Sequence, residues 1–211
     1  MNVMFVFVKP LYFLIPLEAA LFLVFVWMLS FFRDPVRDII NDEGVLYSPA
    51  DGTITDISVT DMPVSDVSAP GTKVLKIGMF LSIFSVHINR FPCSVRVEKV
   101  TYNKGRFKNA MSAESGRVNE SNDVLMLRLV KPEIKFLVRQ ISGAVARRIV
   151  CEAGEKSEYA QGQPFGMIKF GSRAELYIPA NGSGEGLAYE VAVKTGDKVY
   201  AGLTPLIRFQ K

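Results

Sequence analysis

The sequence predicts a mostly β protein: a single antiparallel β domain with few short helices, preceded by an N-terminal hydrophobic membrane helix. Three observations support this prediction: the apolar character of residues 1–32, the short alternating apolar runs after them, and the Pro, Gly, Asn and Asp residues between these runs. A chain of 211 residues can form one such domain with a short appendage, but not two full domains.

The N-terminal segment, residues 1–32, carries only Lys9 and Glu18 as charges. Residues 13–32 are interrupted only by Pro16 and Glu18, and about 20 apolar residues in an α-helix cross a hydrocarbon core. A cleaved signal peptide would have a shorter apolar region and a small-residue cleavage site. Because Glu18 is costly inside a bilayer, an interfacial or re-entrant anchor stays open beside the spanning helix.

The charges after this segment predict its orientation. Arg33 and Arg37 follow the apolar run directly, and an excess of cations on that side favours the cytoplasm. We therefore expect an anchor over residues 1–32 in the cell (inner) membrane, with a catalytic domain over residues 33–211 on the cytoplasmic side.

The β domain is predicted from alternating runs rich in Val, Ile, Leu and Phe. Residues 143–151 are a weak helix candidate, and Lys194-Thr-Gly-Asp is a strong turn signal. The predicted strands are residues 45–47, 52–58, 73–80, 94–102, 124–129, 135–140, 190–193 and 203–209.

Two turns resemble those of hammerhead and lipoyl-carrier domains: residues 48–52 (Ser-Pro-Ala-Asp-Gly) and residues 193–202. The resemblance concerns architecture only, because no lysine lies at the tip of a tight hairpin where a carrier would need it. A membrane-anchored, non-enzymatic carrier or adaptor domain is nevertheless one alternative function.

Composition argues against metal chemistry. Cys93 and Cys151 are the only cysteines and His87 is the only histidine, whereas a catalytic zinc site usually takes three protein ligands. We predict no metal and no nucleic-acid partner. The two cysteines are expected to be free thiols in a reducing compartment.

A basic cluster precedes the middle of the chain. Six cations against the single acid Glu98 would attract an anionic lipid surface, or would simply protect a solvated strand edge. Both interpretations stay open. The cations are Arg90, Arg96, Lys99, Lys104, Arg106 and Lys108.

Three positions could carry acid–base or nucleophilic chemistry. His87 is the only side chain with an unperturbed pKa near neutrality, although a lone histidine is more often structural. Asp51 could orient a histidine or merely cap its turn. The Gly171-Ser172 pair lies between apolar residues that can fix its geometry, unlike the second pair, Gly182-Ser183, in a glycine-rich connection.

Taken in order, these segments resemble the phosphatidylserine decarboxylases, in particular their short, archaeal-type subfamily. The resemblance covers most of the chain, from Phe31 to about Pro179. It is carried by residues 31–37 (Phe-Phe-Arg-Asp-Pro-Val-Arg), 48–52, 80–82 with 86–90 (Val-His-Ile-Asn-Arg), 102–110, and 166–173 (Gly-Met-Ile-Lys-Phe-Gly-Ser-Arg).

The resemblance implies a proenzyme that cuts itself between Gly171 and Ser172. The products would be a β chain, residues 1–171, and an α chain, residues 172–211, whose first residue becomes a pyruvoyl cofactor. This carbonyl would form a Schiff base with phosphatidylserine and release phosphatidylethanolamine and CO₂, without pyridoxal phosphate. A pyruvoyl decarboxylase acting on another amino-group substrate is a further alternative.

The same resemblance suggests residue roles. His87 would supply the proton for the product carbon, and Asp51 with His87 would activate Ser172. In the long bacterial branch the histidine loop reads His-x-x-His, whereas Arg90 stands three residues after His87 here, and arginine is no base at neutral pH. Arg90, with Lys104 and Arg106, is instead a candidate for binding the lipid phosphate. The oligomeric state stays open, with a homodimer as one option.

Overall fold

The computed structural model describes residues 4–63, 73–112, 114–144, 148–169, 171–181 and 187–210. The backbone forms two compact units, Met1–Asp34 and Pro35–Lys211, and each is described by itself. The Gly182-Ser183 pair lies outside the described residues.

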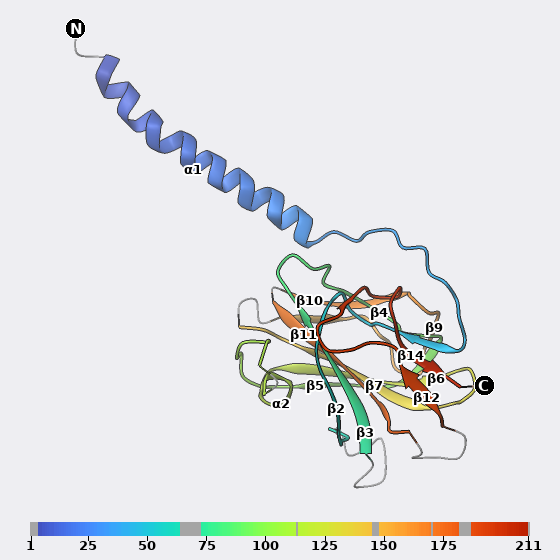
Figure 1. Ribbon diagram of the computed structural model, residues 1–211. Coiled ribbons are helices and arrows are strands. Elements are labelled where there is room, and N and C mark those ends of the chain that lie inside the picture. The colour runs from blue at the N-terminus through green and yellow to red at the C-terminus, as the bar shows by residue number, and fades with distance from the viewer. Residues whose placement is uncertain are drawn as a thin grey trace. The chain divides into compact units, whose positions relative to one another are not determined.

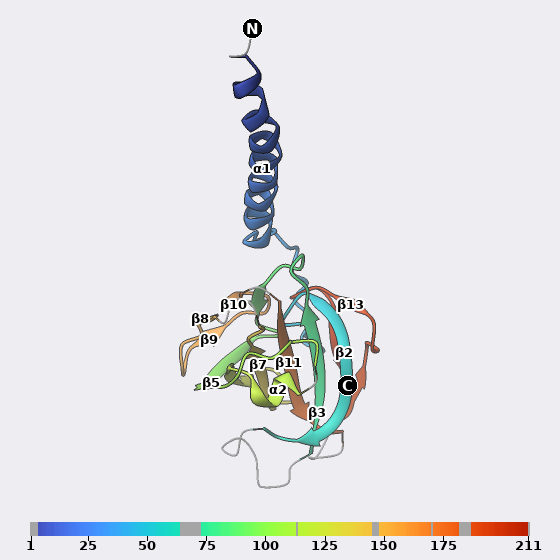
Figure 2. The ribbon, with the colours of Figure 1, turned by 90° about the vertical axis from the view of Figure 1, so that its left-hand side faces the viewer.

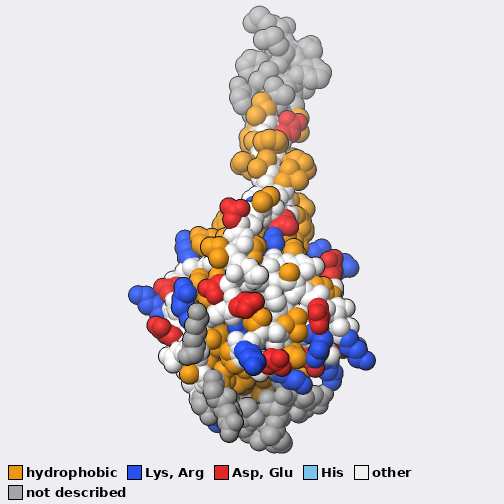
Figure 3. Space-filling view, turned by 90° about the vertical axis from the view of Figure 1, so that its right-hand side faces the viewer, with side chains coloured by type: hydrophobic (Ala, Val, Ile, Leu, Met, Phe, Trp, Pro, Cys, Tyr) orange, Lys and Arg blue, Asp and Glu red, His pale blue; other side chains and the backbone are white. Residues whose placement is uncertain are grey.

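The first unit contains one long helix, α1 (Met4–Phe31), of 28 residues. Its part Leu14–Phe31 is long and apolar enough to cross a membrane. The helix continues through Pro16 and Glu18, and apart from the exposed Glu18 the side chains along its described surface are mostly apolar (Figure 3). The predicted N-terminal hydrophobic helix is therefore confirmed.

The second unit consists of three antiparallel sheets, which confirms the predicted mostly β fold (Figures 1 and 2). The large sheet has the strand order β13-β2-β3-β11-β7-β6-β5-β9, and the two small sheets have the orders β1-β14-β12 and β4-β10-β8. The strands of the large sheet are β2 (Gly52–Asp61), β3 (Lys73–Leu81), β5 (Val95–Asn103), β6 (Ser121–Arg128), β7 (Lys135–Ile141), β9 (Glu158–Tyr159), β11 (Ser172–Pro179) and β13 (Lys198–Val199). Those of the small sheets are β1 (Val45–Tyr47), β4 (Ile88–Arg90), β8 (Ile149–Cys151), β10 (Pro164–Ile168), β12 (Tyr189–Val191) and β14 (Pro205–Phe209).

The strand predictions agree with the structure to within a few residues at each end. The helix prediction for residues 143–151 is wrong over Ile149–Cys151, which forms β8; residues 145–147 lie outside the described part of the chain. Ile149 and Val150 are β-branched and pair with β10, so tertiary pairing prevails over a weak helical pattern. The turn at Lys194–Asp197 forms as expected, with Gly196 at φ 96° and the Lys194 amide donating to Asp197.

The two faces of the large sheet have opposite chemistry, because successive side chains of a strand point to opposite sides. On β11, Ala174, Leu176 and Ile178 belong to the main hydrophobic core, together with residues of the two small sheets such as Phe165 and Leu206. The alternate residues of β11, Arg173, Glu175 and Tyr177, therefore lie on the outer face, and all three are buried.

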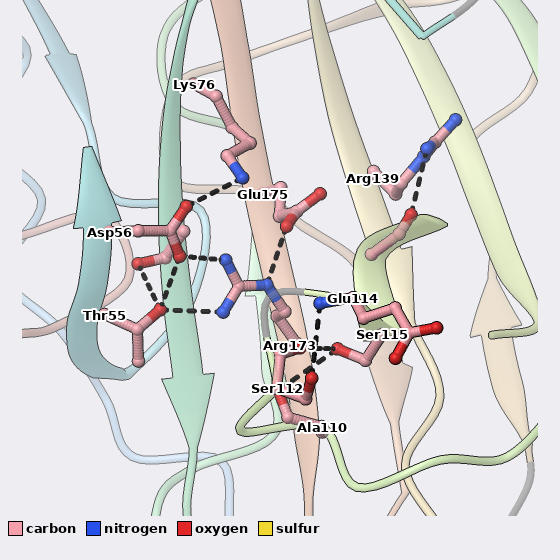
Figure 4. A network of polar contacts seen from close by, with 12 residues as sticks. Thr55, Asp56, Lys76, Ala110, Ser112, Glu114, Ser115, Arg139, Arg173 and Glu175 are labelled. Atoms are coloured by element: carbon pink, nitrogen blue, oxygen red, sulfur yellow. Dashed lines mark hydrogen bonds and ion pairs between the residues drawn. The ribbon is translucent and has the colours of Figure 1, made fainter. Parts of the chain in front are cut away.

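These outer-face residues take part in a charged network (Figure 4). The Arg173 guanidinium contacts Asp56 and donates to Glu175 at 2.6 Å, while Lys76 pairs with Asp56 at 2.8 Å. Burial alone would raise the pKa of Asp56, but the hydrogen bonds from Lys76 and Arg173 outweigh it and lower that pKa. Burial raises the pKa of Tyr177, and Glu175 raises it further.

A short helix, α2 (Ser115–Val118), covers this network on the outer face (Figure 2). The Arg139 guanidinium donates to the carbonyl oxygen of Gly116 at 3.1 Å and also pairs with Asp123. A Cβ on Gly116 would lie 2.6 Å from a carboxylate oxygen of Glu175, so glycine is needed for the helix to lie this close. The network and α2 thus cover part of the outer face of the sheet, whose core-facing side is mostly apolar.

The first prediction concerns the acid sensitivity of this network. Since the pKa of Asp56 is lowered in the folded state, its charge contributes stability above its unfolded pKa of about 3.9, and this is lost as the pH falls through the lower, folded pKa. We expect Asp56→Asn to cost about 2 kcal/mol of unfolding free energy at pH 6. The difference from the wild type should shrink steadily below pH 4.

The measurement is urea denaturation of the full chain in detergent micelles at several pH values. Asp61→Asn is the matched control, because its ion pair with Lys73 is exposed on both sides and should contribute little. An Asp56→Asn effect independent of pH would contradict the assignment.

Candidate active site

The Gly171-Ser172 pair lies where the chain passes from one sheet to another. β10 ends at Ile168 in a small sheet, and β11 begins at Ser172 in the middle of the large sheet. Gly171 has φ 66°, a left-handed conformation that glycine adopts without the strain of other residues. The bend therefore depends on this glycine.

Ser172 begins β11 on the side of the sheet that faces the core, in alternation with Ala174 and Leu176. Its side chain is completely buried. Within the described part of the chain its hydroxyl oxygen has no hydrogen-bond partner. An unsatisfied buried hydroxyl costs about 1–3 kcal/mol of folding free energy, so it is rare in proteins, and a catalytic role is one reason for its presence.

His87 lies in a second passage between the same two sheets. This connection leaves the large sheet after Leu81, the residue opposite Ser172, and enters the small sheet at β4. The backbone amide of Ile168 donates to the His87 carbonyl oxygen at 3.3 Å. The two passages are therefore neighbours at both ends, Leu81 beside Ser172 and His87 beside Ile168. Between these ends, a Cβ built on Gly171 would lie 4.0 Å from the Ile83 side chain.

The hydrogen bonding of His87 determines which ring nitrogen carries the proton when the ring is neutral. Its ring is fully buried, and Nδ1 lies 2.9 Å from the carbonyl oxygen of Ser85. A carbonyl oxygen can only accept, so Nδ1 donates its proton in this contact. In the neutral ring Nε2 therefore carries the lone pair, which is the form a general base needs.

Asp51 lies in the turn between β1 and β2. Its carboxylate pairs with Arg37 at 2.8 Å and accepts a hydrogen bond of 2.8 Å from the Ala201 amide. The same turn contacts β4, because the Pro49 carbonyl oxygen accepts from the Arg90 amide at 3.0 Å. Asp51 thus fastens three segments next to the strand that follows His87.

The three predicted phosphate-binding residues lie in different places. Arg90 is buried in β4, and its guanidinium donates to the Gly162 carbonyl oxygen at 2.9 Å. Lys104 and Arg106 are exposed on the connection after β5. Lys104 lines an outer-face cleft of about 760 Å³ whose walls include Glu175, on the side of the sheet away from Ser172.

A chain of buried amides near His87 was not anticipated. Asn122 donates to the Gln140 side-chain oxygen at 3.1 Å, Gln140 donates to Asn89 at 2.9 Å, and Asn89 donates to the Pro49 carbonyl oxygen at 3.3 Å. The chain connects the large sheet to β4. The signal in the sequence is a polar residue at the core-facing positions of β6 and β7, where the alternation calls for an apolar one.

The structure also bears on the alternatives for the chemistry. Among the described residues there is no cluster of three or more His, Cys, Asp and Glu side chains that could hold a metal. Burial raises the pKa of the Cys93 thiol to about 12, and it raises that of Cys151 as well. Both thiols are therefore protonated at neutral pH and are poor nucleophiles.

The fold and the site together define a class of protein: a β domain in which a buried serine at a glycine bend and a buried histidine lie on two neighbouring connections between the same two sheets. Comparison with known proteins gives the family. A model of the family "Phosphatidylserine decarboxylase" matches residues 24–206, and the chain belongs to this family.

Three relatives are each named phosphatidylserine decarboxylase proenzyme. One from Pelagibacter ubique is 39% identical over 183 residues, 87% of this chain and 80% of the relative. One from Wolbachia pipientis is 38% identical over 181 residues, 86% and 75% of the two chains. One from Rhodopirellula baltica is 40% identical over 199 residues, 93% and 77% of the two chains.

The comparisons decide between the functions considered above. The chain is a decarboxylase proenzyme with phosphatidylserine as its substrate, and a non-enzymatic carrier domain is not favoured. Proenzymes of this family use a pyruvoyl group that arises by autocatalytic cleavage. The archaeal-type subfamily stays a prediction.

The second prediction concerns the bend. Gly171→Ala places a Cβ in a left-handed conformation at a cost of about 1–2 kcal/mol. It causes no clash with the described residues other than its chain neighbours, since the nearest of their atoms is 4.0 Å away. We expect the variant to fold with a slightly lower unfolding free energy and to cleave itself more slowly, measured by the time course on a denaturing gel.

Gly196→Ala is the matched control, because Gly196 has φ 96° and, its chain neighbours aside, no atom of the described part of the chain lies within 4 Å of its built Cβ. It should show a similar loss of stability and unchanged cleavage. Wild-type cleavage in Gly171→Ala would show that this bend does not matter for processing.

Proposed function

We propose that Ser172 attacks the carbonyl carbon of Gly171, and that the proenzyme is cut there into chains of residues 1–171 and 172–211. The observation that carries this proposal is the buried Ser172 hydroxyl, which has no hydrogen-bond partner among the described residues and lies at the glycine bend next to the His87 connection. A nucleophile held in this way has no competing contact to break.

The cleavage balances without an outside reagent except water. The Ser172 oxygen forms an ester with the Gly171 carbonyl carbon as the peptide C–N bond breaks and the nitrogen takes up a proton. Removal of the Ser172 Cα proton then breaks the Cβ–O bond, which releases Gly171 as a carboxylate and leaves a dehydroalanine. Water hydrolyses its imine form with loss of ammonia, so that residue 172 ends as a pyruvoyl group.

The residues present fit this group. It would occupy the buried start of β11, where Ser172 lies between β3 and β7. The chemistry it supplies is an electron sink for the pair that remains when carbon dioxide leaves the substrate.

His87 is the proton carrier in this proposal. Its Nε2 lone pair accepts the Ser172 hydroxyl proton during cleavage, and in turnover the same atom delivers a proton to the product carbon. The Nδ1 contact with Ser85 fixes the ring for both steps. Buried apolar walls around the corner, such as Leu81 and Ile168, exclude competing water.

Asp51 acts as a positioning residue in this scheme. Its contacts with Arg37 and Ala201 hold together the turn before β2, the segment after residue 34 and the turn after β13. Through Pro49 this turn also holds β4, which His87 precedes. Phosphate binding by Arg90, Lys104 and Arg106 stays a prediction.

The location follows from the substrate, which is a membrane lipid, and from α1. We propose that residues 1–32 anchor the chain in the inner membrane and that residues 33–211 act at the cytoplasmic surface on phosphatidylserine, releasing phosphatidylethanolamine and CO₂. Arg33 after the helix and the free thiols of Cys93 and Cys151 support this side.

The third prediction concerns the nucleophile. Ser172→Ala should leave an intact chain of 23.4 kDa without decarboxylase activity, whereas the wild type should give fragments of 171 and 40 residues. Intact-mass spectrometry of the short fragment should show a pyruvoyl end in place of serine. Ser183→Ala, in the second Gly-Ser pair of the sequence, is the control and should cleave normally; cleavage of Ser172→Ala would exclude this serine.

The fourth prediction concerns His87. His87→Ala should lose at least about 100-fold in decarboxylation, because general acid–base catalysis typically contributes a factor of 10² to 10⁴. CO₂ release from phosphatidylserine is the measurement, normalised to the amount of cleaved chain. His87→Gln keeps a donor toward Ser85 but cannot carry a proton at neutral pH, so an equal loss is expected; activity in the glutamine variant would reduce His87 to a structural role.

A further inference from the structure

An exposed apolar tip lies directly beside the Gly171 bend. Ile83 and Phe84, in the connection between β3 and β4, are 41% and 68% exposed. The side chain of Ile83 is the nearest neighbour of a Cβ built on Gly171, at 4.0 Å. Large apolar side chains thus face solvent next to Gly171, the residue that precedes the proposed nucleophile.

A second turn adds apolar side chains at the same end of the large sheet. Tyr200 and Leu203, 52% and 39% exposed, follow β13. β13 pairs with the start of β2, and this start contacts the end of β3, because a Cβ on Gly52 would meet the Phe80 carbonyl oxygen. Ile83, Phe84, Tyr200 and Leu203 are called the apolar edge below.

Cations accompany this edge. Lys169 lies two residues before Gly171, and its amide donates to the Arg148 carbonyl oxygen at 3.1 Å. Arg148 is exposed, and Lys169 is half-buried. An apolar tip with cations beside it has the chemistry of a surface that binds an anionic lipid bilayer, since the apolar part enters the interface and the cations face lipid headgroups.

We propose that the apolar edge inserts into the headgroup region of an anionic bilayer and places the Gly171–Ser172 corner at the level of the substrate's headgroup. The inference rests on the proposed function, because a lipid whose acyl chains stay in the bilayer can react only at an enzyme site that comes to the surface. Residues at the opposite end of the sheet, such as Val59 on β2, are not expected to enter the bilayer.

The direct test measures where Phe84 lies. The only tryptophan of the chain is Trp27, so Phe84→Trp in a Trp27→Phe background gives a single fluorescent reporter. The full chain is reconstituted in phosphatidylglycerol–phosphatidylcholine vesicles with or without bromine on the acyl chains. We expect a blue-shifted emission that brominated lipid quenches by at least about half.

Val59→Trp in the same background is the matched control, because Val59 is 63% exposed and pairs with the start of β3, at the other end of the sheet. Its emission should stay at the wavelength of exposed tryptophan and remain unquenched. Absence of quenching in Phe84→Trp overturns the proposal. A blue shift that depends on protein concentration and not on brominated lipid also overturns it, because a second copy of the chain would then cover the edge.

The functional test compares two forms of the substrate. Phe84→Ser should lower kcat/KM on phosphatidylserine in vesicles about tenfold more than on short-chain phosphatidylserine dispersed below its critical micelle concentration. Val59→Ser should change neither value. Equal losses on both forms would contradict docking.

The amount of self-cleaved chain on a gel separates this proposal from the proposed function. If the wild type is not cut after Gly171, the proposed function fails, whereas the quenching result still decides whether the edge enters the bilayer. If Phe84→Ser does not cleave itself, Tyr200→Ser and Leu203→Ser together take its place in the comparison of the two substrates.

Discussion

The site depends on one backbone constraint: the chain must leave a small sheet at Ile168 and enter the middle of the large sheet at Ser172. Only three residues make this passage, and Gly171 makes it with a left-handed φ of 66°. The passage that contains His87 joins the same two sheets. Since both passages are fixed by strand pairing, the segments that carry the histidine and the serine lie next to each other without any long loop to hold them.

The two faces of β11 show how one strand can serve two purposes. Its core-facing residues start with Ser172 and continue as apolar side chains, so the hydroxyl lies at the margin of a dry core. On its outer face, Arg173 ties β11 to β2 through Asp56, and Glu175 of the same strand pairs with Arg173. Ion pairs of this kind give register rather than large net stability. They hold β11 in register with β2 next to the bend at Gly171.

Much of this could be predicted from the sequence. Alternation predicts eight of the strands, and motifs in their order predict the family, because both are local signals. The short strands β4, β9 and β13 are not predicted, and β8 is predicted as a helix, because two or three residues carry too little periodicity. The contacts of Asp51 could not be found in this way: Arg37 and Ala201 are 14 and 150 residues away, and the pairing depends on tertiary structure. Arg90 and Lys104 show the same limit, since charge alone cannot tell a buried carbonyl-binding arginine from an exposed lysine in an outer-face cleft.

The position of the last 40 residues in the sheets has a consequence for any break of the chain at this corner. β11 lies between β3 and β7, and β14 lies between β1 and β12, so the C-terminal piece is interleaved with the rest of the domain. Both pieces would stay in place through their ladders, and neither could leave without general unfolding. The new ends, however, would be released from the bend, so a severed backbone would gain local freedom and could not easily rejoin.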